Sequence, residues 1–242
     1  MSDSEDDPRV SVSPFHAGEI AVQERCGVSE AIGRVGRVVI RNLMLPDHRE
    51  LFVRLPMLLV GSLDASRRPW ASVLVGSPGF VHAEDERMLR VDALPAPADP
   101  FEEGLATGAP LGLLGIELAT RRRNRMNGTI VARDDRGFTV AVDQSFGNCP
   151  QYIQARSPRW RRPPASFRDA RATVAIGARL DAAARAIVER ADTLFIASAA
   201  PAAHGHAGAD GVDVSHRGGK PGFVKVRQRA GHSADRADAV AA

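Results

Sequence analysis

Four arginines lie close together at positions 121, 122, 123 and 125. If this segment is a β-strand, side chains alternate, so Arg121, Arg123 and Arg125 share one face and Arg122 and Asn124 share the other. A guanidinium presents several N–H donors in a fixed fork that suits phosphate oxygens. The cluster therefore predicts a phosphate-binding strand. The alternative from charge alone is a solvated edge strand whose charges oppose aggregation.

A second use of these arginines is nucleic-acid binding. All but two of the 32 basic Lys and Arg residues are arginines, and the sequence pI is about 9.4. This interpretation would add the linker arginines Arg156, Arg159, Arg161 and Arg162, with Tyr152 and Trp160 as stacking platforms. The net charge of +3 gives only a mild field, so we expect no nucleic-acid partner.

Other polar groups fall on strands or beside them. Trp70 and Ser72 alternate onto one strand face, where the hydroxyl could donate to a phosphate or a planar ring. Large aromatic residues in strands more often pack in a core, which is the alternative for Trp70. Gln144 and Asn148 carry amides able to bond a ring edge, although Asn148 could instead brace a turn. Asn127 precedes Gly128, a pair that by itself signals a type I′ hairpin turn.

Metal and thiol chemistry are not expected. Cys26 and Cys149 have no metal-ligand spacing and fit a reducing compartment. We interpret Cys149 as a small buried residue. His204 and His206 form a conceivable metal pair without an evident third ligand.

The elements that must position these residues follow from turn signals and hydrophobic spacing. Ser29 begins one helix, and Asp47 with Glu50 predicts a capping box for a second helix that Pro56 ends. A third helix is expected at Asp181–Asp192. Strands are expected at Met57–Leu63, Trp70–Val75, Phe80–Ala83, Met88–Ala93, Leu111–Leu118, Arg121–Arg133, Phe138–Val142 and Thr193–Ser198. This meander predicts a mainly β fold with flanking helices, built on a small antiparallel barrel.

The chain then divides into five segments. Residues 1–51 form a disordered N-terminus and N-terminal helices, 52–155 a first barrel, and 156–190 a linker and helix. Residues 191–226 would be an incomplete second barrel half, because Ser215–Val226 repeats the turn, basic residue, proline and strand of Asp64–Val75. Residues 227–242 form a tail without strand periodicity. A composition with 44% hydrophobic residues, no long apolar run and an acidic N-terminus predicts a cytoplasmic protein.

Two long motifs carry a resemblance to a known family. The run GLLGIELATRRRNRMNG at 112–128 and the run QSFGNCPQYI at 144–153 resemble the pyridoxamine 5'-phosphate oxidase-like flavoproteins, which have an FMN-binding split barrel. The strand Leu59–Leu63, the Asp64 turn and the run RPWAS at 68–72 fit that family too. The resemblance is to tandem-barrel bacterial members, with the second half truncated here. Arg67 departs from the pattern, because this turn position is commonly Gly.

The resemblance implies FMN as the cofactor and a flavin-dependent oxidoreductase acting on a small molecule. NADH, NADPH or oxygen would be the redox partner, and a second chain would replace the missing half, giving a homodimer. His216 and Arg217 could reach the cofactor across an interface between barrels. The alternatives are a non-catalytic flavin or ligand carrier and an inactive truncation product. The expected cofactor-binding residues are Trp70, Ser72, Arg121, Arg122, Arg123, Arg125, Asn127, Gln144 and Asn148.

Overall fold

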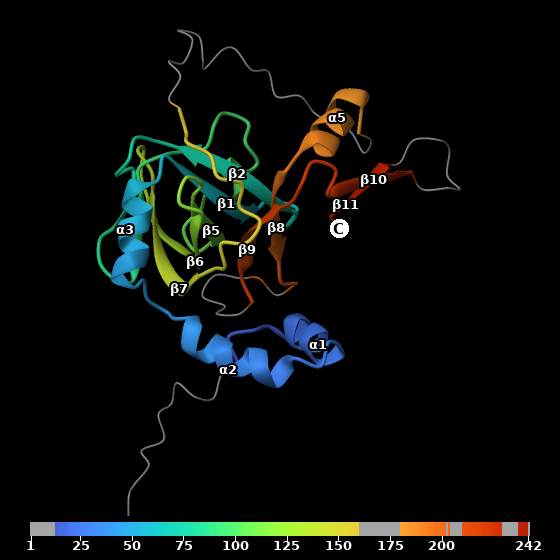
Figure 1. The fold of residues 1–242 in the computed structure, drawn as a ribbon. Helices are drawn as coiled ribbons and strands as arrows, with labels where there is room; N and C mark the ends of the chain where they lie inside the picture. The colour runs from blue at the N-terminus through green and yellow to red at the C-terminus, as the bar shows by residue number, and fades with distance from the viewer. Residues whose placement is uncertain (1–12, 160–179, 202, 204–209, 229–236, 242) are drawn as a thin grey trace, which may run out of the picture.

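The fold is mainly β, as the sequence predicts (Figure 1). A computed structural model describes residues 13–159, 180–201, 203, 210–228 and 237–241. Its main sheet is antiparallel with strand order β2-β1-β5-β6-β7-β4-β3, an arrangement consistent with a split barrel. The strands are β1 (Met57–Leu63), β2 (Pro69–Val75), β3 (Val81–Ala83), β4 (Met88–Val91), β5 (Pro110–Glu117), β6 (Arg122–Arg133) and β7 (Phe138–Gly147).

One face of this sheet encloses the larger core. Strand alternation sends Leu58 and Val60 into it from β1, and both are fully buried. Helices α3 (Pro46–Arg54) and α4 (Phe101–Gly104) cover it, and the Phe101 and Phe138 rings meet edge to face at 5.6 Å. Burial of these apolar groups fixes which residues of each strand face away from the core.

The opposite face carries a two-stranded sheet of β8 (Thr193–Ala199) and β9 (Val212–Gly218). A smaller core of Leu59, Leu114, Ile116, Ile153 and Val214 joins the two sheets. Gly61 and Gly112 permit the close approach, since a Cβ on Gly112 would lie 2.6 Å from the Asp213 Cα. Figure 1 shows β9 running beside the outer face of the main sheet.

Helices α1, α2 and α3 precede the sheet in the described part of the chain, and the sequence did not predict the first of them. Helix α1 (Ala17–Arg25) begins at a capping box in which His16 Nδ1 accepts backbone N–H groups and Glu19 accepts the His16 N–H. Helix α2 (Ser29–Val39) confirms the predicted helix. The predicted Asp47–Glu50 capping box is wrong, because Pro46 occupies the first turn of α3 and places the cap at Leu45, which has no side-chain acceptor.

The C-terminal part differs from the predicted repeat. Ser215 lies inside β9, which pairs with β8, whereas β10 (Val224–Gln228) pairs with β11 (Ala237–Ala241). The prediction that Ser215–Val226 repeats the Asp64–Val75 hairpin is therefore wrong. The prediction that residues 227–242 lack a strand is wrong too, because β11 lies there. Helix α5 (Ala182–Arg190) lies within the range expected for a helix, and Asp181 is its N-cap. Trp160, Arg161, Arg162, His204 and His206 lie outside the described residues.

Among the residues that the structure describes, no helix is both long enough and apolar enough to cross a membrane.

Candidate functional site

The arginine cluster does not act as one group. Arg121 lies in the turn before β6 with φ of 56°, so it does not share the strand face predicted for it. Arg122 is exposed at the start of β6, opposite Glu117 on β5. Arg123 and Arg125 instead face β9. Strand alternation thus holds for this pair, and the tight turn removes Arg121 from it.

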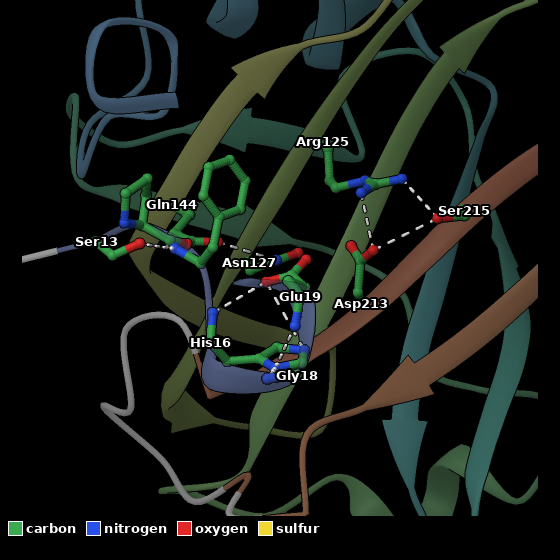
Figure 2. Close-up of polar contacts among 11 residues, drawn as sticks. Ser13, His16, Gly18, Glu19, Arg125, Asn127, Gln144, Asp213 and Ser215 are labelled. Atoms are coloured by element: carbon green, nitrogen blue, oxygen red, sulfur yellow. Dashed lines mark hydrogen bonds and ion pairs between the residues drawn. The ribbon is translucent and has the colours of Figure 1, made fainter. Parts of the chain in front are cut away.

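Arg125 is held by carboxylate and hydroxyl groups of β9 (Figure 2). Its Nη1 lies 2.8 Å from Asp213 Oδ2, and its Nη2 donates to Ser215 Oγ at 2.6 Å. The guanidinium also lies over the Phe146 ring, 5.4 Å from its centroid. Burial lowers the pKa of Arg125, and Asp213 opposes that effect. The charge of Arg125 is therefore largely compensated within the chain.

A cavity of about 200 Å³ lies beside this pair, under the N-terminal segment 14–19. Asn127 Nδ2 donates to Gln144 Oε1 at 3.4 Å, and Gln144 Nε2 donates to the Pro14 carbonyl at 2.9 Å. In Figure 2, Gln144, Asn127, His16 and Glu19 lie to the left of Asp213 and Ser215. Two predicted site residues, Asn127 and Gln144, are thus brought together with Arg125.

Arg123 has a different environment on the other side of β9. Its Nη1 lies 3.2 Å from His216 Nδ1. A guanidinium can only donate, so Nδ1 accepts and the imidazole proton resides on Nε2. Only 3% of His216 is exposed, and its Nε2 has no hydrogen-bond partner in the part of the chain described. The result is a buried N–H donor without an acceptor.

The pKa of His216 agrees with this assignment. Burial, and then the neighbouring charges of Arg123 and Arg217, lower the pKa of His216 to about 4. Burial likewise lowers the pKa of Arg123. The imidazole is therefore neutral near pH 7, with one nitrogen accepting and one donating.

A hollow of about 490 Å³ opens at these donors. It is lined by Arg123, Gln151, Tyr152, His216, Arg217, Gly218, Gly219 and Phe223. No carboxylate is among these residues, and none within the described ranges forms an ion pair with Arg123 or Arg217. Gly218 is needed here because a Cβ would lie 2.0 Å from the Tyr152 carbonyl oxygen. The hollow presents cationic and N–H donors together with two aromatic rings.

The remaining predicted site residues lie elsewhere. Ser72 is buried on β2, on the sheet face opposite the one that meets β9. Its Oγ donates to Asp99 Oδ1 at 2.5 Å. Trp70 Nε1 donates to Asp64 Oδ2 at 2.9 Å, which braces the β1–β2 hairpin. Asn148 lies just beyond β7, and its backbone N–H donates to the Arg123 carbonyl. Cys149, expected to be buried, is exposed.

Sequence reasoning singled out His216 and Arg217 but missed Asp213, Ser215 and Glu19. The alternation of Asp213, Ser215 and Arg217 along one strand was an available signal. The sequence gives no indication, however, that β9 crosses β6, because that contact joins residues about ninety positions apart.

Comparisons with known proteins add little to this geometry. No protein-family model matches the sequence, and no curated protein matches it. One solved structure, a variant of HupZ from Group A Streptococcus, aligns with 10% identity and a TM-score of 0.33. The alignment covers 43% of this chain and 99% of the HupZ chain. Similarity this remote assigns no function.

Proposed function

We propose that the protein binds FMN, with the phosphate held by Arg123, His216 and Arg217. The observation that carries this proposal is the lining of the 490 Å³ hollow, which includes two guanidiniums, those of Arg123 and Arg217, and the His216 imidazole, and no carboxylate. A dianionic phosphate supplies the acceptors that such donors lack. The same donors would penalise a cationic ligand.

The rest of the hollow fits a phosphorylated aromatic ligand. Its volume falls within the range of about 300–1,000 Å³ typical of small-molecule sites. Tyr152 and Phe223 supply aromatic surface for a planar ring, and Gly218 and Gly219 keep the backbone accessible. The smaller cavity at Arg125 does not fit FMN, because its volume is too small and its lining includes Glu19 and Asp213.

When bound, the flavin accepts and donates hydride, and the protein supplies position and electrostatics. We therefore propose a flavin-dependent oxidoreductase that acts on a small molecule, with NADH, NADPH or oxygen as the redox partner. The alternative is a non-catalytic flavin carrier on the same fold. Turnover of NADH or NADPH with an artificial acceptor distinguishes them, since a carrier leaves both nucleotides unoxidised.

The first test is the visible spectrum of the purified protein, with the released cofactor identified by mass. We expect FMN in a 1:1 ratio, and at least about 100-fold weaker binding of riboflavin, which lacks the phosphate and so loses the contacts with all three residues. Arg123→Ala should weaken FMN binding about 10–100-fold, as expected for loss of a charged hydrogen bond. Arg122→Ala, on the opposite strand face, is the matched control and should leave the affinity unchanged.

A colourless protein that FMN cannot reconstitute would overturn the proposal. Equal effects of Arg122→Ala and Arg123→Ala would contradict the assignment of the phosphate to this hollow.

A further inference from the structure

The cavity beneath the N-terminal segment is lined by both apolar and polar side chains. The apolar ones include Pro14, Phe15, Ile40 and Phe146. The polar ones, which Figure 2 shows, are His16, Glu19, Arg125, Asn127, Gln144 and Asp213. This cavity lies at the Asp213 end of β9, whereas the hollow at Arg123 lies at the His216–Gly218 end, and the two share no lining residue. It is therefore a distinct candidate site.

The lining has two carboxylates, Glu19 and Asp213, and one guanidinium, Arg125. Arg125 pairs with Asp213 at 2.8 Å, and the basic group beside Glu19 in the described part of the chain is the His16 imidazole, whose Nε2 lies 3.7 Å from Glu19 Oε2. Glu19 Oε2 accepts the backbone N–H of His16, which holds the carboxylate at the start of α1. A ligand with one positive charge would balance the lining.

Two acceptor atoms in the lining lack donors. Asp213 Oδ2 accepts from Arg125 and Ser215, whereas Asp213 Oδ1 is fully buried and accepts no hydrogen bond in the described part. Asn127 Oδ1 is likewise buried and unpartnered. Arg125 Nε is a buried donor without an acceptor in the same lining. Buried polar atoms without partners are costly, and the two oxygens favour a ligand that carries N–H groups.

The volume limits the apolar body of that ligand. A cavity of about 150 Å³ in another protein holds benzene. The volume of about 200 Å³ here therefore suits one ring and a short polar arm. A flavin exceeds this volume, and the phosphate of a phosphorylated amine would be repelled by the Glu19 and Asp213 carboxylates of the lining.

We propose that this cavity binds a compact primary ammonium ion with an apolar body about the size of benzene. The ammonium group lies among Glu19, Asn127 and Asp213 and donates to the two unpartnered oxygens. The apolar body packs against Phe15, Ile40 and Phe146. This proposal does not depend on FMN binding, because the two sites have separate linings.

Isothermal titration of the full-length protein with benzylammonium tests the proposal. We expect saturable 1:1 binding, at least tenfold weaker binding of the neutral isostere benzyl alcohol, and no binding of benzoate. Equal affinity for benzylammonium and benzyl alcohol would overturn the role of the charge. Absence of any saturable heat with benzylammonium would overturn the site.

Two substitutions in one helix locate the binding. Glu19→Gln keeps the capping box but removes the charge, and should weaken benzylammonium binding about 3–10-fold. Glu24→Gln, in the same helix but outside the cavity lining, is the matched control and should have no effect. Equal effects of the two substitutions would contradict the proposal. FMN affinity, measured in parallel, should be unchanged in both variants.

Discussion

Arg123 and Arg125 lie two positions apart on one strand and have opposite electrostatic surroundings. Arg125 is ion-paired with Asp213, whereas Arg123 faces a neutral imidazole. Strand β9 produces the difference, since Asp213 and His216 reach neighbouring arginines from a single strand. At the residue scale, a guanidinium's partner therefore decides whether it can bind a ligand anion.

The pH dependence of stability tests the environment of His216. Its pKa of about 4 lies below the ordinary value of 6.5, so the unfolded chain binds a proton that the native state excludes. The free energy of unfolding should therefore fall as pH falls from about 6.5 to about 4, by at most about 3 kcal/mol from this group. Above pH 6.5 the group contributes no slope. Urea unfolding at pH 7.5 and 4.5 measures the change.

The control for this prediction is His216→Gln, which keeps one acceptor and one donor but does not titrate. Acidification should cost the variant less stability than the original protein. An identical loss in both proteins would show that His216 is not the buried neutral group described here.

The Arg125–Asp213 pair gives a second prediction at this scale. Arg125→Leu leaves the Asp213 carboxylate partly buried without its cation. Breaking fully buried pairs costs about 3–5 kcal/mol, and partial exposure should reduce the cost here to about 2 kcal/mol. Adding Asp213→Leu should recover most of this stability in urea unfolding. A double variant as unstable as the single variant would show that packing, not charge, causes the loss.

At the scale of elements, the site depends on how closely β9 packs against the main sheet. Gly61 and Gly112 leave room for the β9 backbone. The sequence shows both glycines, but in a strand they equally well indicate a bulge or a weak position. The structure shows that both positions need glycine because the β9 backbone packs directly against them.

Gly112→Ala tests this packing. Its Cβ would lie 2.6 Å from the Asp213 Cα and 2.7 Å from the Val212 carbonyl oxygen, and both are backbone atoms. We expect a destabilisation of about 1–3 kcal/mol, as for overpacked cores, and weaker binding at both proposed sites. Thermal unfolding and the two titrations measure these effects.

Gly147→Ala is the matched control, because a Cβ there meets no atom within 4 Å. It should leave stability and both affinities nearly unchanged. If the Gly112 and Gly147 variants behave alike, close packing of β9 is not what forms the sites.

At the scale of the whole molecule, we expect a homodimer. Strand β2 is an edge of the main sheet, and its Val73 and Val75 side chains are 49% and 58% exposed. An exposed apolar edge strand favours pairing with another chain. Light scattering of the flavin-loaded protein should give twice the chain mass of 25.9 kDa, and Val75→Lys should shift the population towards monomer. A monomer that retains stoichiometric FMN would contradict this expectation.

Much of the fold followed from local patterns. Alternating apolar residues and turn signals predicted the strands of the main sheet within a few residues, except that β7 continues to Gly147 instead of ending at Val142. Helix α1 was missed because its cap is His16, an uncommon capping residue, and because no apolar stripe marks it. The repeated hairpin was wrong because a similar run of residues can pair with different strands.

The sequence by itself determined the strands of the main sheet and the place of the arginine cluster on one of them, since side-chain period is a local property. The sequence did not determine which arginine has its charge compensated by a carboxylate. That depended on β9 crossing β6, which brings residues 213–217 against residues 123–125. Such a contact is fixed by the packing of Val214 with Leu59 and Leu114 and by the space at Gly112. These are properties of the assembled sheets, and no single segment carries them.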